Sequence, residues 1–158
     1  MSRAFIREVD DAPPPPPLER TASGAANLVT PRGARLIEET IAGIEAALRA
    51  APAEKDEASL RRDLRYWTAR RASARLVPTD PHPRSAAFGT KVTIRRGVLV
   101  SDVLIVGEDE AEPAKGRVAW TAPLARALEG AIRGEIVELE AGGRVEEIAV
   151  LSVRPGEG

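Results

Sequence analysis

The apolar positions of residues 31–74 repeat with the period of an α-helix, in two segments separated by a short polar stretch. The first stripe consists of Leu36, Ile37, Ile41, Ile44 and Leu48. The second stripe consists of Leu60, Leu64, Trp67 and Ala74. Thr30 before Pro31 predicts the start of the first helix, Pro52 predicts its end, and Asp56 is the candidate N-cap of the second. Two amphipathic helices joined by a short turn predict an antiparallel helical hairpin, a short coiled coil, over residues 28–77.

Beyond residue 87 the apolar period changes from that of a helix to that of a β-strand. Runs rich in β-branched residues predict strands at residues 92–94, 98–106, 118–120, 136–139 and 145–153. Gly142 and Gly143 are a hairpin signal between the last two strands, and residues 123–128 predict one short helix that begins at Pro123. The predicted fold class is therefore α+β, with an N-terminal helical hairpin followed by a small antiparallel β-sheet domain at residues 88–158.

Two further segments are predicted to lack regular structure. Residues 1–27 read as a disordered tail, because they hold a polyproline run at 13–17 and few large apolar groups. Within this tail, Ala4-Phe5-Ile6 is the one stretch that could dock as an apolar anchor. Residues 78–87 are a linker in which closely spaced prolines exclude a helix. Its His82 is interpreted as a solvated linker residue rather than as a pH sensor.

The amino-acid composition excludes several functional classes but says less about the fold. The chain of 158 residues has one His and no Cys, which removes thiolate catalysis, disulfides, zinc fingers and multi-His metal sites. It has neither a P-loop nor a dinucleotide-binding motif. No apolar run is long enough to span a membrane, and no apolar core of a secretory signal follows Arg3. We expect a cytoplasmic protein that is not an enzyme and has no catalytic residue, metal, cofactor or membrane partner.

The charge is unevenly distributed, although the formal net charge is only −1. Residues 59–77 carry six Arg and one Asp, whereas residues 100–158 are acidic. The candidates for contact with nucleic acid or an acidic protein surface are Arg61, Arg62, Arg65, Arg70 and Arg71. Tyr66 and Trp67 lie among them, and Arg together with aromatic rings can bind a phosphate backbone. The alternative is a solvated helix face whose Arg stems shield the apolar seam.

Two clusters of acidic residues in the sequence could bind a metal ion. Glu54, Asp56 and Glu57 lie at the predicted tip of the hairpin, where they could reach into another protein's active site and help to hold Mg²⁺. The alternative is a polar turn in which Asp56 caps a helix. The run 108–110, together with Glu112, could bind a hard cation, but it lacks the alternating order of a calcium loop. A solvated turn is the preferred interpretation of that run.

Several motifs of the chain occur together in one known family. Residues 122–128 have the sequence A-P-L-A-R-A-L and are followed by Gly134-Glu135. Residues 28–33, 62–66, 88–92 and 105–111 are the other matching stretches. The first motif resembles the signature S-P-L-A-R-A-L…G-D of the GreA/GreB transcription elongation factors. The others resemble, in turn, the opening of that family's first helix, the end of its second, its first sheet strand, and its second strand with an acidic turn. The resemblance covers residues 28–153 and implies that the sheet domain is FKBP-like.

The hairpin departs from the family pattern. It is about 20 residues shorter than a full Gre arm, or about 10 per helix, which removes about 15 Å of reach. The tip motif G-D-x-S-E-N-A is absent, so the acidic tip residues are not equated with the family's cleavage acids. A short hairpin is similar instead to the Rnk branch, and this resemblance implies binding to RNA polymerase without stimulation of transcript cleavage.

The resemblance implies a regulator of transcription elongation that binds RNA polymerase at its secondary channel. It would dock through the sheet domain and either occupy the channel or compete for it. The residues expected to dock are Pro123, Leu124 and Leu128. We expect a monomer, and contact with nascent RNA or DNA of the elongation complex stays open. The alternative within this family is a true Gre-type factor that stimulates cleavage of backtracked transcripts through Glu54, Asp56 and Glu57.

Two other functional classes stay open. An FKBP-like fold can be a prolyl isomerase, but that activity needs an aromatic-lined pocket and the region offers only Phe88 and Trp120. A non-enzymatic adaptor is the other possibility, with the Pro-rich tail as the ligand of another module.

Overall fold

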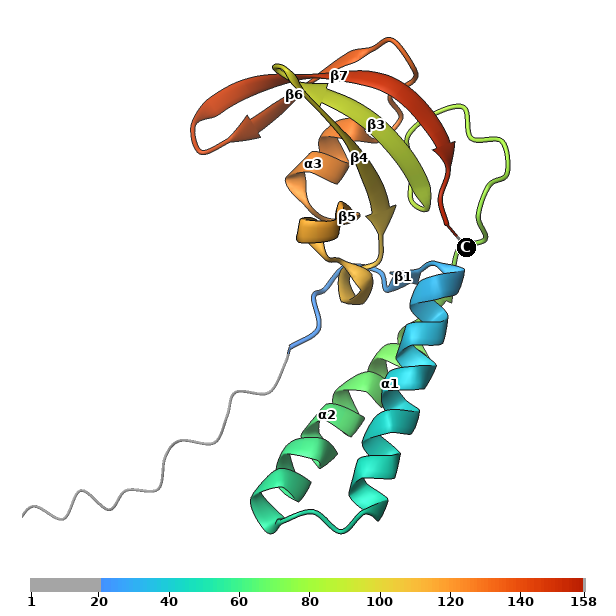
Figure 1. Cartoon of the computed structure of the whole chain (residues 1–158), viewed down its shortest axis with the longest axis vertical. Coiled ribbons are helices and arrows are strands. Elements are labelled where there is room, and N and C mark those ends of the chain that lie inside the picture. Colours follow the sequence, from blue (N-terminus) through green and yellow to red (C-terminus); the bar gives the residue numbers. More distant parts are fainter. Residues whose placement is uncertain (1–20, 158) are drawn as a thin grey trace, which may run out of the picture.

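The computed structural model describes residues 21–157 (Figure 1). The first 20 residues, which include the polyproline run and the Ala4-Phe5-Ile6 anchor, lie outside the described residues, as does Gly158. The elements in chain order are β1 (Leu28–Val29), α1 (Pro31–Arg49), α2 (Glu54–Ser73), β2 (Arg75–Leu76), β3 (Thr90–Arg96), β4 (Leu99–Val106), η1 (Glu108–Glu110), η2 (Pro113–Lys115), β5 (Arg117–Ala119), α3 (Pro123–Leu128), β6 (Ile136–Ala141) and β7 (Arg144–Pro155).

Helices α1 and α2 form the predicted antiparallel hairpin. The start of α1 is confirmed, because the hydroxyl of Thr30 accepts a 2.9 Å hydrogen bond from the Gly33 N–H ahead of Pro31. The N-cap prediction for α2 is wrong. That helix begins earlier, at Glu54, and has Ala53 at the cap without a side-chain hydrogen bond. The buried residues of the hairpin seam come from α1 and its entry, and α2 contributes Leu64 and Trp67, which are partly buried.

The base of the hairpin is closed by two short strands. β1 and β2 pair in parallel, with hydrogen bonds from the Arg75 N–H to the Asn27 carbonyl and from the Val77 N–H to the Val29 carbonyl. Leu28 and Val29, the first residues of the stretch that resembles the opening of the family's first helix, form β1 ahead of the helix. The backbone is extended through Thr30 and becomes helical only at Pro31. Both ends of the hairpin are thus joined to each other as well as to the rest of the chain.

The remaining strands form one sheet in the order β5-β4-β3-β7-β6. The predicted five strands and one short helix are confirmed, and the fold is α+β. The sheet is mixed rather than wholly antiparallel. β5 runs parallel to β4, because residues 107–116 carry the chain back beside Leu104 before β5 begins. The sheet arches over α3, as Figure 1 shows.

The space between the arched sheet and α3 holds the main core. Its fully buried side chains include Val92 and Ile94 of β3, Ile148 and Val150 of β7, and Leu128 of α3. These are the alternate positions of β3 and β7, as expected when one face of a sheet packs inward. Within residues 21–157, none of the helices is long and apolar enough to cross a membrane.

Candidate functional site: a projecting hairpin and its junction

The two-helix hairpin projects away from the sheet domain (Figure 1). We call helices α1 and α2 with their connecting turn the finger. α1 has 19 residues and α2 has 20, so the finger is about 30 Å long at about 1.5 Å per residue. The turn at its tip contains Ala51, whose φ of 51° is in the left-handed region, followed by Pro52. This turn ends α1 and reverses the chain into α2.

The three acidic tip residues lie in the first turn of α2 but are not equivalent. Glu57 is half-buried and accepts hydrogen bonds from Arg61, at 2.6 Å from Nη2 and 2.8 Å from Nε. Glu54 and Asp56 are exposed, but residues two apart on a helix point to different sides. Among the described residues there is no group of three or more His, Cys, Asp or Glu that could hold a metal ion. Negative charge at this position does stabilise the start of α2.

The Arg residues of α2 fall into two groups. Arg61, Arg65 and Arg71 are exposed and Arg62 is half-buried. Arg61 is paired with Glu57 on its own helix, and Arg71 contacts Glu38 of α1 at 3.4 Å. This group forms a basic surface on the outside of the finger.

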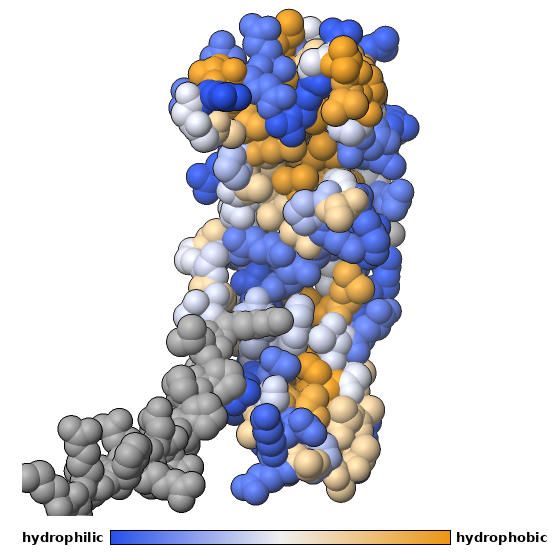
Figure 2. Space-filling view, turned by 60° about the vertical axis from the view of Figure 1, so that its left-hand side comes forward, coloured by the Kyte–Doolittle hydropathy of each residue, from blue (hydrophilic) through white to orange (hydrophobic). Residues whose placement is uncertain are grey.

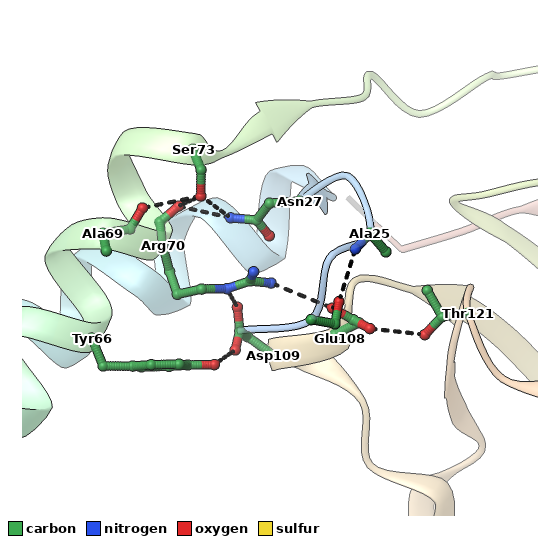
Figure 3. A network of polar contacts seen from close by, with 10 residues as sticks. Ala25, Asn27, Tyr66, Ala69, Arg70, Ser73, Glu108, Asp109 and Thr121 are labelled. Atoms are coloured by element: carbon green, nitrogen blue, oxygen red, sulfur yellow. Dashed lines mark hydrogen bonds and ion pairs between the residues drawn. The ribbon is translucent and has the colours of Figure 1, made fainter. Parts of the chain in front are cut away.

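Arg70 does not belong to that surface, because its side chain is only 4% exposed. Its Nε donates a hydrogen bond to Asp109, and its Nη2 lies 3.8 Å from Glu108. The Tyr66 hydroxyl donates to the same Asp109 carboxylate at 2.6 Å. Figure 3 shows both side chains reaching from α2 to the turn that follows β4. The prediction that Arg70 contacts a partner is therefore wrong, because it faces the protein's own sheet domain.

The acidic run 108–110 joins the finger to the sheet domain. Glu110 is buried, and its carboxylate accepts hydrogen bonds from the Thr30 hydroxyl at 2.5 Å and from Arg32 at 2.9 Å. Glu108 accepts from Ser23 at 2.6 Å and from Thr121 at 3.0 Å. The interpretation of this run as a solvated turn is wrong. We call η1 and the residues that its three carboxylates contact the junction.

Two glycines allow the close approach at the junction. A Cβ at Gly33 would lie 2.8 Å from Glu110 Oε2, and a Cβ at Gly107 would lie 2.5 Å from the main-chain oxygen of Leu28. Both distances are shorter than real Cβ contacts. α1 and β1 can therefore pack against η1 only because these positions lack side chains.

The three residues predicted to dock on a partner differ in exposure. Pro123 is exposed, whereas Leu124 is half-buried and packs against the core. Leu128 is 0% exposed, so it belongs to the core, and its assignment to a docking surface is wrong. In a helix of six residues, sequence spacing does not show which side meets the sheet.

Other apolar side chains are exposed on the sheet domain. Val98 and Leu99, at the turn between β3 and β4, are 93% and 73% exposed. Figure 2 shows hydrophobic residues gathered on the visible face of the sheet domain. The predicted strand 98–106 included Val98 and Leu99, and their exposure was not predicted. The available signal was that Val98 and Leu99 follow Gly97, because the residues of such a turn are usually polar.

The perturbed titratable groups lie on the sheet domain. The pKa of Glu146 is lowered, chiefly by its hydrogen bonds from Arg96, and the pKa of Arg96 is raised by the same contact. The pKa of Asp102 is lowered, first by the hydroxyl of Thr93 and then by nearby cations. Linker His82 is exposed, and its backbone N–H donates a hydrogen bond to the Asp80 carboxylate.

Comparison with known proteins identifies the sheet domain. The family model "Transcription elongation factor, GreA/GreB, C-term" matches residues 81–155. The sheet domain is therefore similar to the C-terminal domain of the GreA/GreB family. A GreA of Neisseria meningitidis serogroup B is 39% identical over 80 residues, which is 49% of this chain and 51% of that protein. A GreB of Neisseria meningitidis serogroup A is 39% identical over 97 residues, which is 58% of each chain. The chain thus spans about half the length of these curated relatives.

The family-model match begins at residue 81 and does not include the finger, whose helix α2 ends at Ser73. Among solved structures, GreA factor homolog 1 (Gfh1) of Thermus thermophilus aligns with 82% of this chain and 99% of its own, at 14% identity and a TM-score of 0.40. Within the matched domain, the signature at residues 122–128 forms α3 and its entry. The acidic motif that follows β4 forms the junction.

Proposed function

We propose that this chain is a regulator of transcription elongation that binds RNA polymerase. The sheet domain carries the GreA/GreB match, and the matched relatives are named transcription elongation factors. The observation on which the proposal depends is the finger, a stiff helix pair that projects from this domain (Figure 1). We infer that the sheet domain docks beside the secondary channel as a monomer and that the finger enters the channel.

Occupation of the channel fits the tip better than stimulated transcript cleavage does. Placing a catalytic Mg²⁺ needs carboxylates that converge on one point. Here Glu57 is engaged by Arg61, and the exposed Glu54 and Asp56 are two residues apart on one helix. In this proposal the polymerase supplies all of the chemistry, and the finger acts by excluding other factors from the channel.

The exposed Arg residues of α2 would contact the walls of the channel or nucleic acid within it. Arg61, Arg62, Arg65 and Arg71 lie along the outside of the finger, where a guanidinium can bind phosphate or carboxylate groups. Because such contacts are screened by salt, changing Arg62 and Arg65 together to Gln should weaken polymerase binding most at low salt.

Docking is tested by co-purification of the full chain with core RNA polymerase. Pro123 is the exposed member of the predicted set, so Pro123→Glu should abolish co-purification while the fold is kept. Pro113→Glu is the matched control, since Pro113 is also exposed and also begins a short helix of the sheet domain. Equal retention of polymerase by both variants would refute docking at α3. Loss of binding on deletion of residues 1–27 alone would favour the adaptor interpretation.

The choice between occupation and cleavage is tested on stalled elongation complexes. The wild-type chain should release no short 3′ RNA fragments, and it should suppress the fragments produced by an added cleavage-stimulating factor. A variant with Glu54, Asp56 and Glu57 all changed to Ala should suppress them equally well. Fragment release by the wild type that disappears in this triple variant would show a Gre-type cleavage factor instead.

A further inference from the structure

The direction of the finger is set where its two helices meet the sheet domain. We propose that Arg70 is a positioning residue that fixes this direction by binding the carboxylates of η1 from the last turn of α2. The orientation itself is a property of the free protein. Its consequence for the polymerase rests on the proposed function.

Each helix of the finger is bonded to a different residue of the same turn. α2 reaches Asp109 through Arg70 and Tyr66, while the start of α1 reaches Glu110 through Thr30 and Arg32. η1 directly follows β4, which is paired with β3 and β5 inside the sheet. The finger is thus attached at two points to a rigid part of the sheet domain, and a rotation about one contact breaks the other.

The attachment through Arg70 is a buried ion pair. It is the buried residue of α2, and the Asp109 side chain is only 14% exposed. A tilt that separated the two would leave both charges in a poorly solvated place without a partner, which is strongly unfavourable. The Arg70 carbonyl also accepts a 2.7 Å hydrogen bond from Asn27, the residue before β1. The same residue therefore ties α2 to the sheet domain and to the strand at the base.

A small change at the junction is amplified at the tip. The finger is about 30 Å long, so a tilt of about 10° at its base moves the tip by about 5 Å. The neighbouring Arg71 offers a matched comparison, since it is exposed and its guanidinium pairs with Glu38 of the same finger. Its loss should not change the angle between the finger and the sheet domain.

The test measures orientation directly. The chain has no Cys, so cysteines introduced as Ala58→Cys on the finger and Glu138→Cys on β6 can carry nitroxide labels. Pulsed electron–electron double resonance on the full chain should give one narrow distance distribution. Arg70→Met should broaden or shift that distribution by several ångströms, whereas Arg71→Met should leave it unchanged. Asp109→Asn should act as Arg70→Met does, and the double variant should add little, because both remove the same contact.

Several results would overturn the inference. If the distance distribution of Arg70→Met had the same width and mean as that of the wild type, Arg70 would not set the direction of the finger. Equal broadening by Arg71→Met would show a general effect of lost charge. If Arg70→Met loses helical circular dichroism, Arg70→Lys is measured instead. That variant keeps the charge but not the fork that spans two carboxylates, so an unchanged distribution in it would also refute the proposal.

The polymerase assay separates this inference from the proposed function. Arg70→Met should still co-purify with polymerase through the sheet domain, but it should lose at least half of the wild type's suppression of transcript cleavage. If the distance distribution of labelled Arg70→Met broadens and the wild type has no effect on RNA polymerase, the inference on orientation stands and the proposed function fails. Full suppression by a variant whose finger is broadly distributed would refute the link between direction and activity.

Discussion

Replacement of Gly33 by Ala tests whether the junction depends on the absence of a side chain. Taken alone, Gly→Ala inside a helix stabilises it by about 1 kcal/mol. At Gly33 the new Cβ would lie 2.8 Å from Glu110 Oε2 and 3.4 Å from Thr30 Oγ1. The carboxylate oxygen would have to leave its 2.5 Å hydrogen bond from Thr30, and losing such a bond to a buried charged group costs about 1.5–3 kcal/mol. The net effect is a loss of roughly 0.5–2 kcal/mol in the free energy of unfolding.

Gly43 provides the matched control for this prediction. It lies on the same helix, and a Cβ added there would meet no atom within 4 Å, so Gly43→Ala should raise the free energy of unfolding by about 1 kcal/mol. Urea unfolding followed by far-ultraviolet circular dichroism measures both variants. Since the helix-propensity gain is common to both, their difference of about 1.5–3 kcal/mol isolates the cost at the junction. Equal stabilisation by the two substitutions would show that the Glu110 contact is dispensable.

Three further predictions concern the sheet domain and its attachment. Leu128→Ala should lower the free energy of unfolding by about 2–5 kcal/mol, because Leu128 is fully buried, whereas Pro123→Ala should cost less than about 1 kcal/mol. Equal costs in urea unfolding would contradict the assignment of Leu128 to the core. Gly107→Ala should cost about 1–3 kcal/mol through overpacking, since its Cβ would meet a main-chain oxygen at 2.5 Å, and an unchanged melting temperature would refute this. The Thr93 hydroxyl lowers the pKa of Asp102 below its ordinary 3.8, so this contribution is present above pH 3.8 and lost as the pH falls through the lower folded value. Asp102→Asn should therefore be less stable than the wild type near neutral pH, and the difference in melting temperature should shrink on acidification. A constant difference would exclude the linkage.

Local patterns predicted the elements of this fold well. The stripe from Ile37 to Leu48 predicted α1, and the alternation around Val92 and Ile94 predicted β3 with its inward face. Both signals come from neighbouring residues, so one sequence is enough to see them. The two residues of β1 are too few to show any alternation, which is why this strand was not predicted.

The junction could not be predicted in the same way. Arg70 and Asp109 are 39 residues apart in sequence. Helical spacing does place Arg70 beside the half-buried Tyr66 and Trp67, but it does not show which segment packs against that side. Only the packing of α2 against η1 shows that this one guanidinium faces inward. For the same reason the sequence could not show that Glu108, Asp109 and Glu110 each contact a different segment.

The paired strands β1 and β2 at the base of the finger make its length independent of its attachment to the sheet domain. Because β1 and β2 hold the entry and exit of the helix pair side by side, whole helical turns can be added to or removed from both helices at the far end without disturbing η1. Two extra turns in each helix would lengthen the probe by about 11 Å. The same base can therefore carry fingers of different length. Short and long fingers would then differ in the part of a partner that the tip contacts, but not in how the finger is attached to the sheet domain.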